Sequence, residues 1–354
     1  MESPNRSWVG QLRLNWEYRR DLATNPRFSS DGDIYHPQHL PQPCSCGANH
    51  RIDDVDWSGF SRPIVFTYRA GTAGMGHVFL RGFQVADMLA TLGAPVPVRV
   101  QPMENLHRAK PRDQVLVILK TAIRMKSEPV LRGFARRKNV LLFDVVDGLV
   151  PSVLASLPHA FVCSSKTEQL ARKNDGLTTI LSLHSPDQRM PAVDFNKRRF
   201  SMVYFGAREN ALHLRELETL KRLTFLNAEV DSKDDFPGQF QRLKEYSHHY
   251  SVRAWNARDG FKPFTKGFSA ARFGAPIIAS SDDKESRLML GADYPYLAPS
   301  SSLDDLMSTI DFAENTHLGT QWDQAIDTMK QLRTMSCPVA TAKQFIEGLR
   351  QFAV

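Results

Sequence analysis

The chain has 354 residues, of which 42% are hydrophobic and 23% are charged. This composition is typical of a globular protein and excludes a disordered or fibrous chain, and a chain of this length is expected to divide into two domains. Its 45 Lys and Arg residues outnumber the 38 Asp and Glu residues, and the resulting net charge of +7 favours anionic partners.

The sequence favours a cytoplasmic location. The longest apolar runs, such as Val115–Leu119, fall short of the roughly 18 residues that a membrane-spanning helix needs, and Met1–Gly10 is too polar for a signal peptide. The four cysteines, at positions 44, 46, 163 and 337, are too few and too scattered for a disulfide framework. We therefore expect free thiols and a reducing compartment.

Residues 1–60 are expected to form an irregular extension with one short helix over 10–22, because they show no sustained hydrophobic period. Residues 61–188 then alternate short apolar strands with helices, which is typical of a Rossmann-like parallel sheet. The predicted strands lie at 63–68, 98–100, 114–119, 140–145, 160–163 and 179–183, and a helix is predicted over 77–92.

A glycine-rich loop follows the first predicted strand, with Gly71, Gly74 and Gly76 ahead of His77. Glycines let the backbone turn sharply and approach a ligand, and the start of the next helix offers N–H groups to an anion. The spacing differs from the dinucleotide fingerprint Gly-x-Gly-x-x-Gly. A ligand-facing loop and a plain tight turn both stay open here. His77 is a base, a hydrogen-bond donor or a simple helix cap.

Ten Lys and Arg residues between His107 and Lys138 face only Asp113 and Glu128 as opposing charges. A solvated helix face is the plain interpretation of this run, and docking to an anionic membrane or a polyanionic acceptor is the alternative. Nucleic acid is disfavoured, because no aromatic residues interleave with the basic ones and no recognition motif is present.

The polar segment 185–199 carries two prolines and is predicted to link the two domains. A second alternating series follows over 196–340, and 341–354 is predicted to be a C-terminal helix. Two such sheets leave a cleft at the carboxyl edges of their strands, where ligands bind. The predicted strands of this series lie at 201–205, 224–227, 250–254, 276–279 and 296–297, and its helices at 211–222, 266–273, 303–312 and 322–335.

The strongest chemical signal lies between Asp259 and Ala279. Pro263 precedes a predicted helix whose first turn carries Thr265 and Lys266, and Gly274 ends that helix before an apolar strand. Lys262, Lys266 and the N–H groups of the helix start would therefore converge on one spot, as a bound diphosphate requires. Two solvated surface lysines are the plain alternative.

The order Lys-Pro-x-x-Lys, helix, Gly-x-Pro-Ile-Ile-Ala resembles the donor-site segment of nucleotide-sugar glycosyltransferases with the GT-B fold. The resemblance extends over about residues 62–340, and motif-grade matches are confined to this segment and the glycine-rich loop. It implies a metal-independent transferase without a cofactor, in which residues 61–188 bind the acceptor and residues 196–340 bind the nucleotide-sugar donor.

The resemblance also assigns roles to individual residues. It places Lys266 at the leaving group, and Asp144, Asp147 and His77 are the further catalytic candidates, since a carboxylate or imidazole at the cleft edge could deprotonate an acceptor hydroxyl or bind the sugar. A turn-forming or helix-capping pair is the plain interpretation of the two aspartates. The predicted ligands of the donor diphosphate are Arg208, Lys262, Thr265, Lys266, Gly74 and Gly76.

The sequence departs from the family at one point. Many retaining members carry two glutamates separated by seven residues around this helix, whereas here Asp259 precedes the segment and Ser269 stands near the second glutamate position. This departure puts the donor sugar and the stereochemical outcome in doubt. His184 is a weaker candidate for a residue that enters the cleft.

Two further clusters invite a metal interpretation. Cys44 and Cys46 lie near His36, His39 and His50, but a Cys-x-Cys pair is a poor zinc ligand, so no metal site is predicted. The adjacent His248 and His249, near a predicted strand, would point to opposite faces of it and could not share one ligand.

The leading hypothesis is transfer of a sugar from a nucleotide diphosphate sugar to a hydroxyl of a glycan or a lipid-linked acceptor, in a cytoplasmic protein with peripheral contact to an anionic membrane and no nucleic-acid partner. Two alternatives stay open. One is a sugar-nucleotide epimerase or hydrolase of the same fold, and the other is a non-catalytic subunit that binds nucleotide sugars or glycans.

Overall fold

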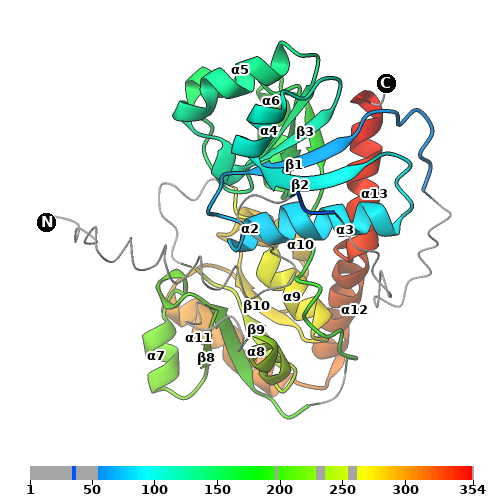
Figure 1. The fold of residues 1–354 in the computed structure, drawn as a ribbon. Coiled ribbons are helices and arrows are strands. Elements are labelled where there is room, and N and C mark those ends of the chain that lie inside the picture. The colour runs from blue at the N-terminus through cyan, green and yellow to red at the C-terminus, as the bar shows by residue number, and fades with distance from the viewer. Residues whose placement is uncertain (1–33, 37–54, 196–197, 229–235, 254–260, 353–354) are drawn as a thin grey trace, which may run out of the picture.

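The computed structural model describes residues 34–36, 55–195, 198–228, 236–253 and 261–352. These residues form two parallel β-sheets, which lie one above the other in Figure 1 with helices packed around each. The predicted α/β fold class with two facing Rossmann-like sheets is therefore confirmed.

The first sheet has six strands in the order β2-β1-β3-β4-β5-β6, and every neighbouring pair is parallel. Its strands are buried on both faces: Ile64 and Phe66 of β1 join one core cluster, and Val65 joins the other. Burial on both faces explains why these strands are nearly continuous apolar runs. The strands are β1 Ile64–Tyr68, β2 Val98–Pro102, β3 Val115–Leu119, β4 Val140–Asp144, β5 Ala160–Cys163 and β6 Thr179–Leu181.

The helices of the first domain are α2 Gly76–Val78, α3 Gln84–Thr91, α4 Met103–Ala109, α5 Glu128–Ala135 and α6 Lys166–Asn174. The single helix predicted over 77–92 is interrupted by a π-helical turn at Phe79–Phe83. Such turns are rare and occur frequently at functional sites. This turn carries Arg81, which is only 2% exposed.

The second sheet has five strands in the order β11-β10-β9-β7-β8, again all parallel. The strand predicted at 250–254 lies earlier, at 248–250, so His248 and His249 belong to a buried central strand. The strands are β7 Met202–Gly206, β8 Thr224–Asn227, β9 His248–Tyr250, β10 Ile277–Ser280 and β11 Leu297–Ala298, and the helices are α7 Leu214–Thr219, α8 Phe236–Leu243, α9 Thr265–Arg272, α10 Lys284–Leu290, α11 Leu303–Asn315 and α12 Thr320–Met335.

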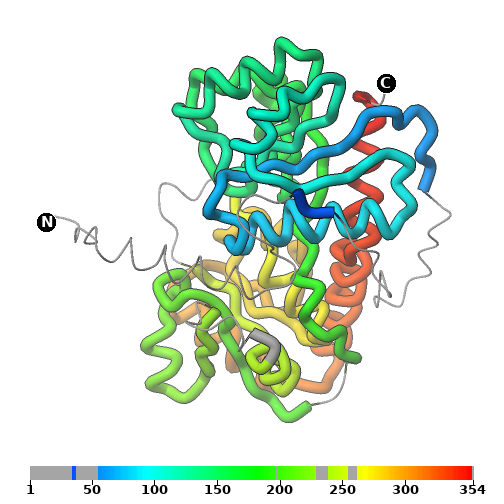
Figure 2. The backbone as a smooth tube through the Cα atoms, viewed as in Figure 1, coloured from blue at the N-terminus to red at the C-terminus, as the bar shows by residue number. Residues whose placement is uncertain are grey.

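The C-terminal helix α13, Pro338–Leu349, returns to the first domain, as the red end of the tube in Figure 2 shows. Its Phe345 and Ile346 are buried in the same cluster as residues of β1. The centres of the Phe66 and Phe345 rings lie 5.8 Å apart. At the other end of the chain, Tyr35 pairs with Val100 of the edge strand β2. The helix predicted over 10–22 lies outside the described residues.

Part of the segment between the two sheets, residues 182–187, is buried rather than solvated. Arg81 donates hydrogen bonds to the carbonyls of Ser182 and Leu183, and Arg272 of the second domain donates one to the carbonyl of Met190 over 2.6 Å. Side-chain donors thus satisfy the backbone of the segment, because buried carbonyls are costly without partners. Side chains of both domains therefore donate hydrogen bonds to the backbone of the segment between the sheets.

Candidate functional site

A cavity of about 480 Å³ lies between the two sheets at the carboxyl ends of their strands. Strand order reverses beside β1 in the first sheet and beside β7 in the second, and such reversals open a crevice where α/β proteins bind ligands. Residues of both domains and of the connecting segment line it, among them Gly76, His77, Lys120, Asp147, His184, Asp187, Arg189, Gly206, His249, Arg253, Lys262, Thr265, Lys266 and Ser269.

Lys266, in the first turn of α9, reaches back under the end of β7. Its Nζ donates a hydrogen bond to the carbonyl of Phe205 over 2.7 Å and lies 4.2 Å from the centre of the Tyr204 ring. Burial, with the charge of Arg253 as a smaller cause, lowers the pKa of Lys266 to about 7. The neutral amine form of Lys266 is thus poised to gain a proton when an anion enters the cavity.

Lys262 and Lys120 bind the two oxygens of one carboxylate, that of Asp147. Lys262 comes from the loop before α9 and Lys120 from the end of β3, so the carboxylate joins the two domains. Burial raises the pKa of Asp147, but its hydrogen bonds and ion pairs with Lys120 and Lys262 outweigh burial and lower that pKa to about 2. Asp147 is therefore an anion at any ordinary pH.

The loop that presents Asp147 has an unusual backbone. Val146 adopts a φ of 56°, the left-handed region that a β-branched residue rarely enters, and Gly148 donates its N–H to the carbonyl of Val145 over 2.7 Å. A Cβ on Gly148 would lie 3.3 Å from Cε of Lys120, so the glycine gives the lysine stem room to pass. Strained residues persist where the surroundings hold them, commonly at functional sites.

Three histidines that line the cavity are neutral at physiological pH. Burial is the main cause that lowers the pKa of His77 to about 4, and that of His184 and of His249 to about 3. His77 lies beside Lys120 and Asp147, and its Nε2 is buried without a hydrogen-bond partner among the described residues. A neutral imidazole at this place can accept a hydrogen bond from a bound hydroxyl.

The helix α9 points its N-terminus at the cavity. No side chain caps this end, and Thr265 and Lys266 of its first turn both line the cavity. Gly274 ends the helix at a φ of 66°, where a Cβ would lie 2.5 Å from the carbonyl oxygen of Asp194, so only glycine fits. The helix dipole and the two lysines therefore favour negative charge at the same spot.

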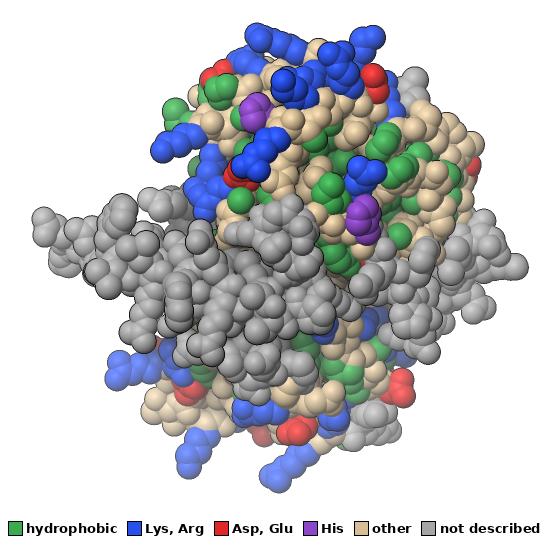
Figure 3. Space-filling view, in the orientation of Figure 1, with side chains coloured by type: hydrophobic (Ala, Val, Ile, Leu, Met, Phe, Trp, Pro, Cys, Tyr) green, Lys and Arg blue, Asp and Glu red, His purple; other side chains and the backbone are tan. Residues whose placement is uncertain are grey.

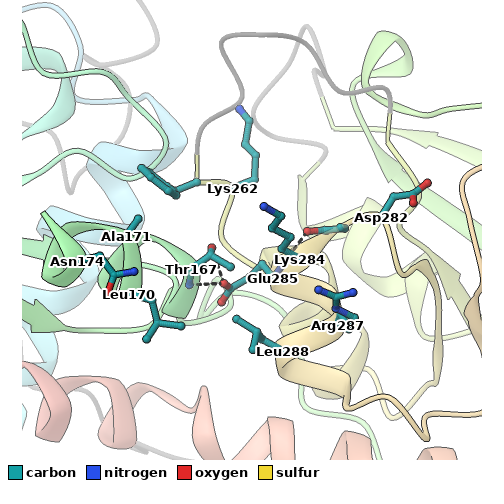
Figure 4. Close-up of a pocket in the computed structure, with 12 residues that line it drawn as sticks. Thr167, Leu170, Ala171, Asn174, Lys262, Asp282, Lys284, Glu285, Arg287 and Leu288 are labelled. Carbon is teal, nitrogen blue, oxygen red and sulfur yellow. Dashed lines mark hydrogen bonds between the residues drawn. The ribbon is translucent and has the colours of Figure 1, made fainter.

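A second cavity of about 510 Å³ adjoins the first at Lys262 and Asp283. Figure 4 shows it between α6 of the first domain and α10 of the second. Within it, the carboxylate of Glu285 accepts hydrogen bonds from the amides of Lys166 and Thr167 and from the Thr167 hydroxyl, over 3.0, 2.8 and 2.7 Å. Glu285 thus caps a helix of the opposite domain.

Three predicted site residues do not line the cavity. Asp144 is buried against Arg81 over 2.8 Å, because it ends its strand pointing into the domain, and burial raises its pKa despite that ion pair. Arg208 turns away to pair with Glu218 over 2.6 Å and to lie 4.3 Å from the Phe225 ring. Of the two predicted loop glycines, Gly76 lines the cavity and Gly74 does not.

Three cavity cations were not identified from the sequence. Lys120 was assigned only to the basic run, and Arg189 and Arg253 were assigned no role, yet all three line the cavity. The position of Lys120 directly after the apolar run Val115–Leu119 is the signal that could have identified it, since ligands bind at the carboxyl ends of parallel strands.

The remaining sequence expectations concern metals and surfaces. No group of three or more His, Cys, Asp or Glu that could hold a metal occurs among the described residues, and Asp259, Cys44, Cys46, His39 and His50 lie outside them. Figure 3 shows Lys and Arg side chains gathered at the end of the molecule where α5 lies. No helix among the described residues has both the length and the apolar character to cross a membrane.

The structure is similar to solved glycosyltransferases, although no protein-family model and no curated protein sequence matches the chain. A glycosyltransferase from Rickettsia africae ESF-5 matches with a TM-score of 0.52 and 9% identity, over 83% of this chain and 98% of that one. A trehalose-6-phosphate synthase matches with a TM-score of 0.50 and 9% identity, over 82% and 99%.

A pneumococcal O-GlcNAc transferase, solved with UDP and GlcNAc, matches with a TM-score of 0.46 and 12% identity, over 71% of this chain. The chain spans only 58% of the length of that protein. The matches with TM-scores of 0.50 and above confirm the predicted resemblance to the GT-B fold.

Proposed function

We propose that the protein is a glycosyltransferase that moves a sugar from a nucleotide diphosphate sugar to a hydroxyl of a glycan or a lipid-linked acceptor. The observation that carries the proposal is the convergence of Lys262, Lys266 and the N-terminus of α9 on one cavity between two domains with the GT-B fold. The two lysines and the helix N-terminus fit the diphosphate of such a donor.

The reaction would draw on charge that develops as the sugar leaves. When the bond between the sugar and the diphosphate breaks, its electron pair passes to the diphosphate, whose negative charge increases. Lys266 is expected to stabilise this charge most, because it is partly buried and its pKa of about 7 rises as an anion forms beside it. With side chains carrying the positive charge, the proposal includes activity without a metal ion.

The acceptor hydroxyl would lose its proton to a group on the wall of the first domain. His77 and Asp147 both line the cavity on that side, whereas Asp144 is removed from the reacting atoms by its ion pair with Arg81. The adjoining groove between α6 and α10 offers a path for the acceptor, since it meets the cavity at Lys262 and presents the exposed Leu170 and Leu288.

A two-stage experiment tests this function. Thermal shift against UDP, GDP, ADP, CDP and TDP identifies the base, because a ligand at a hundred times its dissociation constant stabilises the folded state by about 2.7 kcal/mol. The corresponding nucleotide sugars are then incubated with the protein and with a panel of glycan and glycolipid acceptors, and the products are analysed. Acceptor-dependent release of the nucleoside diphosphate supports transfer.

The other hypotheses predict different products. Conversion of the donor in the absence of any acceptor indicates an epimerase or a hydrolase, and binding without turnover on any acceptor indicates a non-catalytic subunit. Both alternatives use the same diphosphate site, so binding alone does not distinguish them from transfer.

A further inference from the structure

The ion pairs of Asp147 compete with the diphosphate binding that the proposed function requires. The lysine that is expected to bind the donor diphosphate, Lys262, already holds an anion of this chain, and so does its neighbour Lys120. The side chain of Asp147 is only 14% exposed, and its two oxygens are bound by ammonium groups from opposite domains. A ligand with phosphate oxygens must compete with this carboxylate.

We propose that Asp147 is an internal counter-ion that pairs with the phosphate-binding Lys262 before a diphosphate binds and is displaced from it when a diphosphate binds. This inference rests on the proposed function, because it takes Lys262 as a ligand of the donor. It assigns Asp147 a role before donor binding, in addition to any contact with the sugar or the acceptor.

The geometry of the loop supports an exchangeable contact. Asp147 follows Val146, whose left-handed φ of 56° stores strain, and precedes Gly148, whose lack of a side chain leaves room for Lys120. Lys262 lies on the other domain, in the loop that leads into α9. Release of Lys262 leaves Asp147 paired with Lys120 on its own domain, so the carboxylate does not lose every partner.

The exchange has two consequences for the site. The largely buried carboxylate of Asp147 keeps Lys120 and Lys262 in place in the absence of donor, since their two positive charges would otherwise repel each other. Its release from Lys262 removes one of the two charges that lower its pKa, so the carboxylate becomes more basic when the donor is bound. Donor binding thus raises the basicity of Asp147, which is proposed to lie beside the acceptor hydroxyl.

Neutralising the counter-ion should strengthen binding of the ligand that competes with it. We expect Asp147→Asn to bind UDP, GDP or the best nucleoside diphosphate, and inorganic pyrophosphate, about tenfold more tightly than the natural protein at pH 7, the order of one partly buried ion pair. Isothermal titration measures both affinities. Asp147→Ser removes the same carboxylate and gives the comparison should Asp147→Asn not fold.

Two further variants separate the specific exchange from a general change of charge. Asp327 pairs with Lys330 over 2.8 Å on α12 and does not line the cavity, so Asp327→Asn should change the affinity by about twofold or less. In a Lys262→Ala background, the gain from Asp147→Asn should disappear, because the contact that it relieves is already absent.

The outcomes are distinct. A gain in Asp147→Asn that vanishes with Lys262→Ala supports the counter-ion role. An unchanged or weaker affinity in Asp147→Asn, or an equal gain in Asp327→Asn, overturns it while leaving the proposed function intact. Failure of the natural protein to bind any nucleoside diphosphate or pyrophosphate removes the proposed function itself.

Discussion

A Cβ atom at position 206 would lie 2.5 Å from Nζ of Lys266. Gly206 ends β7. The ammonium group of Lys266 occupies the space that a side chain at position 206 would fill, and it donates a hydrogen bond to the carbonyl of Phe205. The same added carbon would lie 2.7 Å from the hydroxyl of Tyr204. The end of β7 is thus shaped so that the side chain of Lys266 can lie across it.

Replacing Gly206 with Ala should displace Lys266 from its position. We expect Gly206→Ala to lower turnover by about tenfold or more, while the cost in stability stays near the roughly 1–3 kcal/mol of an overpacked core site. Steady-state kinetics and chemical denaturation measure the two effects. Gly133→Ala in α5, where the nearest atom to the added carbon is 3.4 Å away on the flexible Arg137 side chain, is the matched control.

Truncation of Lys266 should affect turnover more than donor binding. The diphosphate gains charge only as the sugar leaves, so Lys266→Ala is expected to lower kcat by on the order of 10²–10³ with a smaller loss of donor affinity. Lys330→Ala, on the exposed surface of α12, should leave both unchanged. Normal turnover in a folded Lys266→Ala protein would show that another cation stabilises the leaving group.

Diphosphate binding should take up a proton above pH 7. The pKa of Lys266 is about 7 and rises next to an anion, so at pH 8 the lysine is mostly neutral before the ligand binds, and up to about one proton enters with the ligand. Titration calorimetry in HEPES and in Tris reveals this uptake, because the two buffers differ in ionisation enthalpy. Lys266→Ala should abolish the uptake, and persistence of it there would assign the proton to another group.

The protein should lose stability as the pH falls below about 6.5. His184, His248 and His249 are buried, and burial lowers the pKa of each below the unfolded value, to about 3 for His184 and His249. Below pH 6.5 the unfolded chain therefore binds protons that the folded chain does not, and each histidine weakens the folding equilibrium by up to about tenfold per pH unit.

Urea denaturation at pH 7.5 and at pH 5.5 measures this loss. His249→Gln should reduce the difference between the two pH values, because Gln cannot be protonated. An equal pH difference in the natural protein and in His249→Gln would indicate that His249 does not keep a lowered pKa in the folded protein.

Much of the fold could be predicted because each buried parallel strand appears in the sequence as a short apolar run. Strands Ala160–Cys163 and Thr224–Asn227 have the predicted bounds. The strand that holds His248 and His249 was misplaced, since two polar residues interrupt the apolar pattern. In the structure His248 packs between the rings of Phe200 and Trp322, and His249 stacks on Phe273, so both are part of the core.

The site was predictable where its residues are neighbours in sequence. Lys262, Thr265 and Lys266 share one loop and helix start, and they line the cavity together. The meeting of Lys120 with Asp147 depends on the pairing of β3 with β4, and that of Lys262 with Asp147 depends on how the two domains face each other, which no local pattern records. The same limit explains why Asp144 and Asp147 could not be told apart.

The most direct test of the account is binding of nucleoside diphosphates in the presence of EDTA. We predict that at least one of UDP, GDP, ADP, CDP and TDP raises the melting temperature of the natural protein without added metal, and that Lys262→Ala and Lys266→Ala each weaken this effect. A protein whose melting temperature responds to none of these ligands would contradict the account, and a response that requires manganese or magnesium would show that the positive charge of the site comes from a metal ion instead.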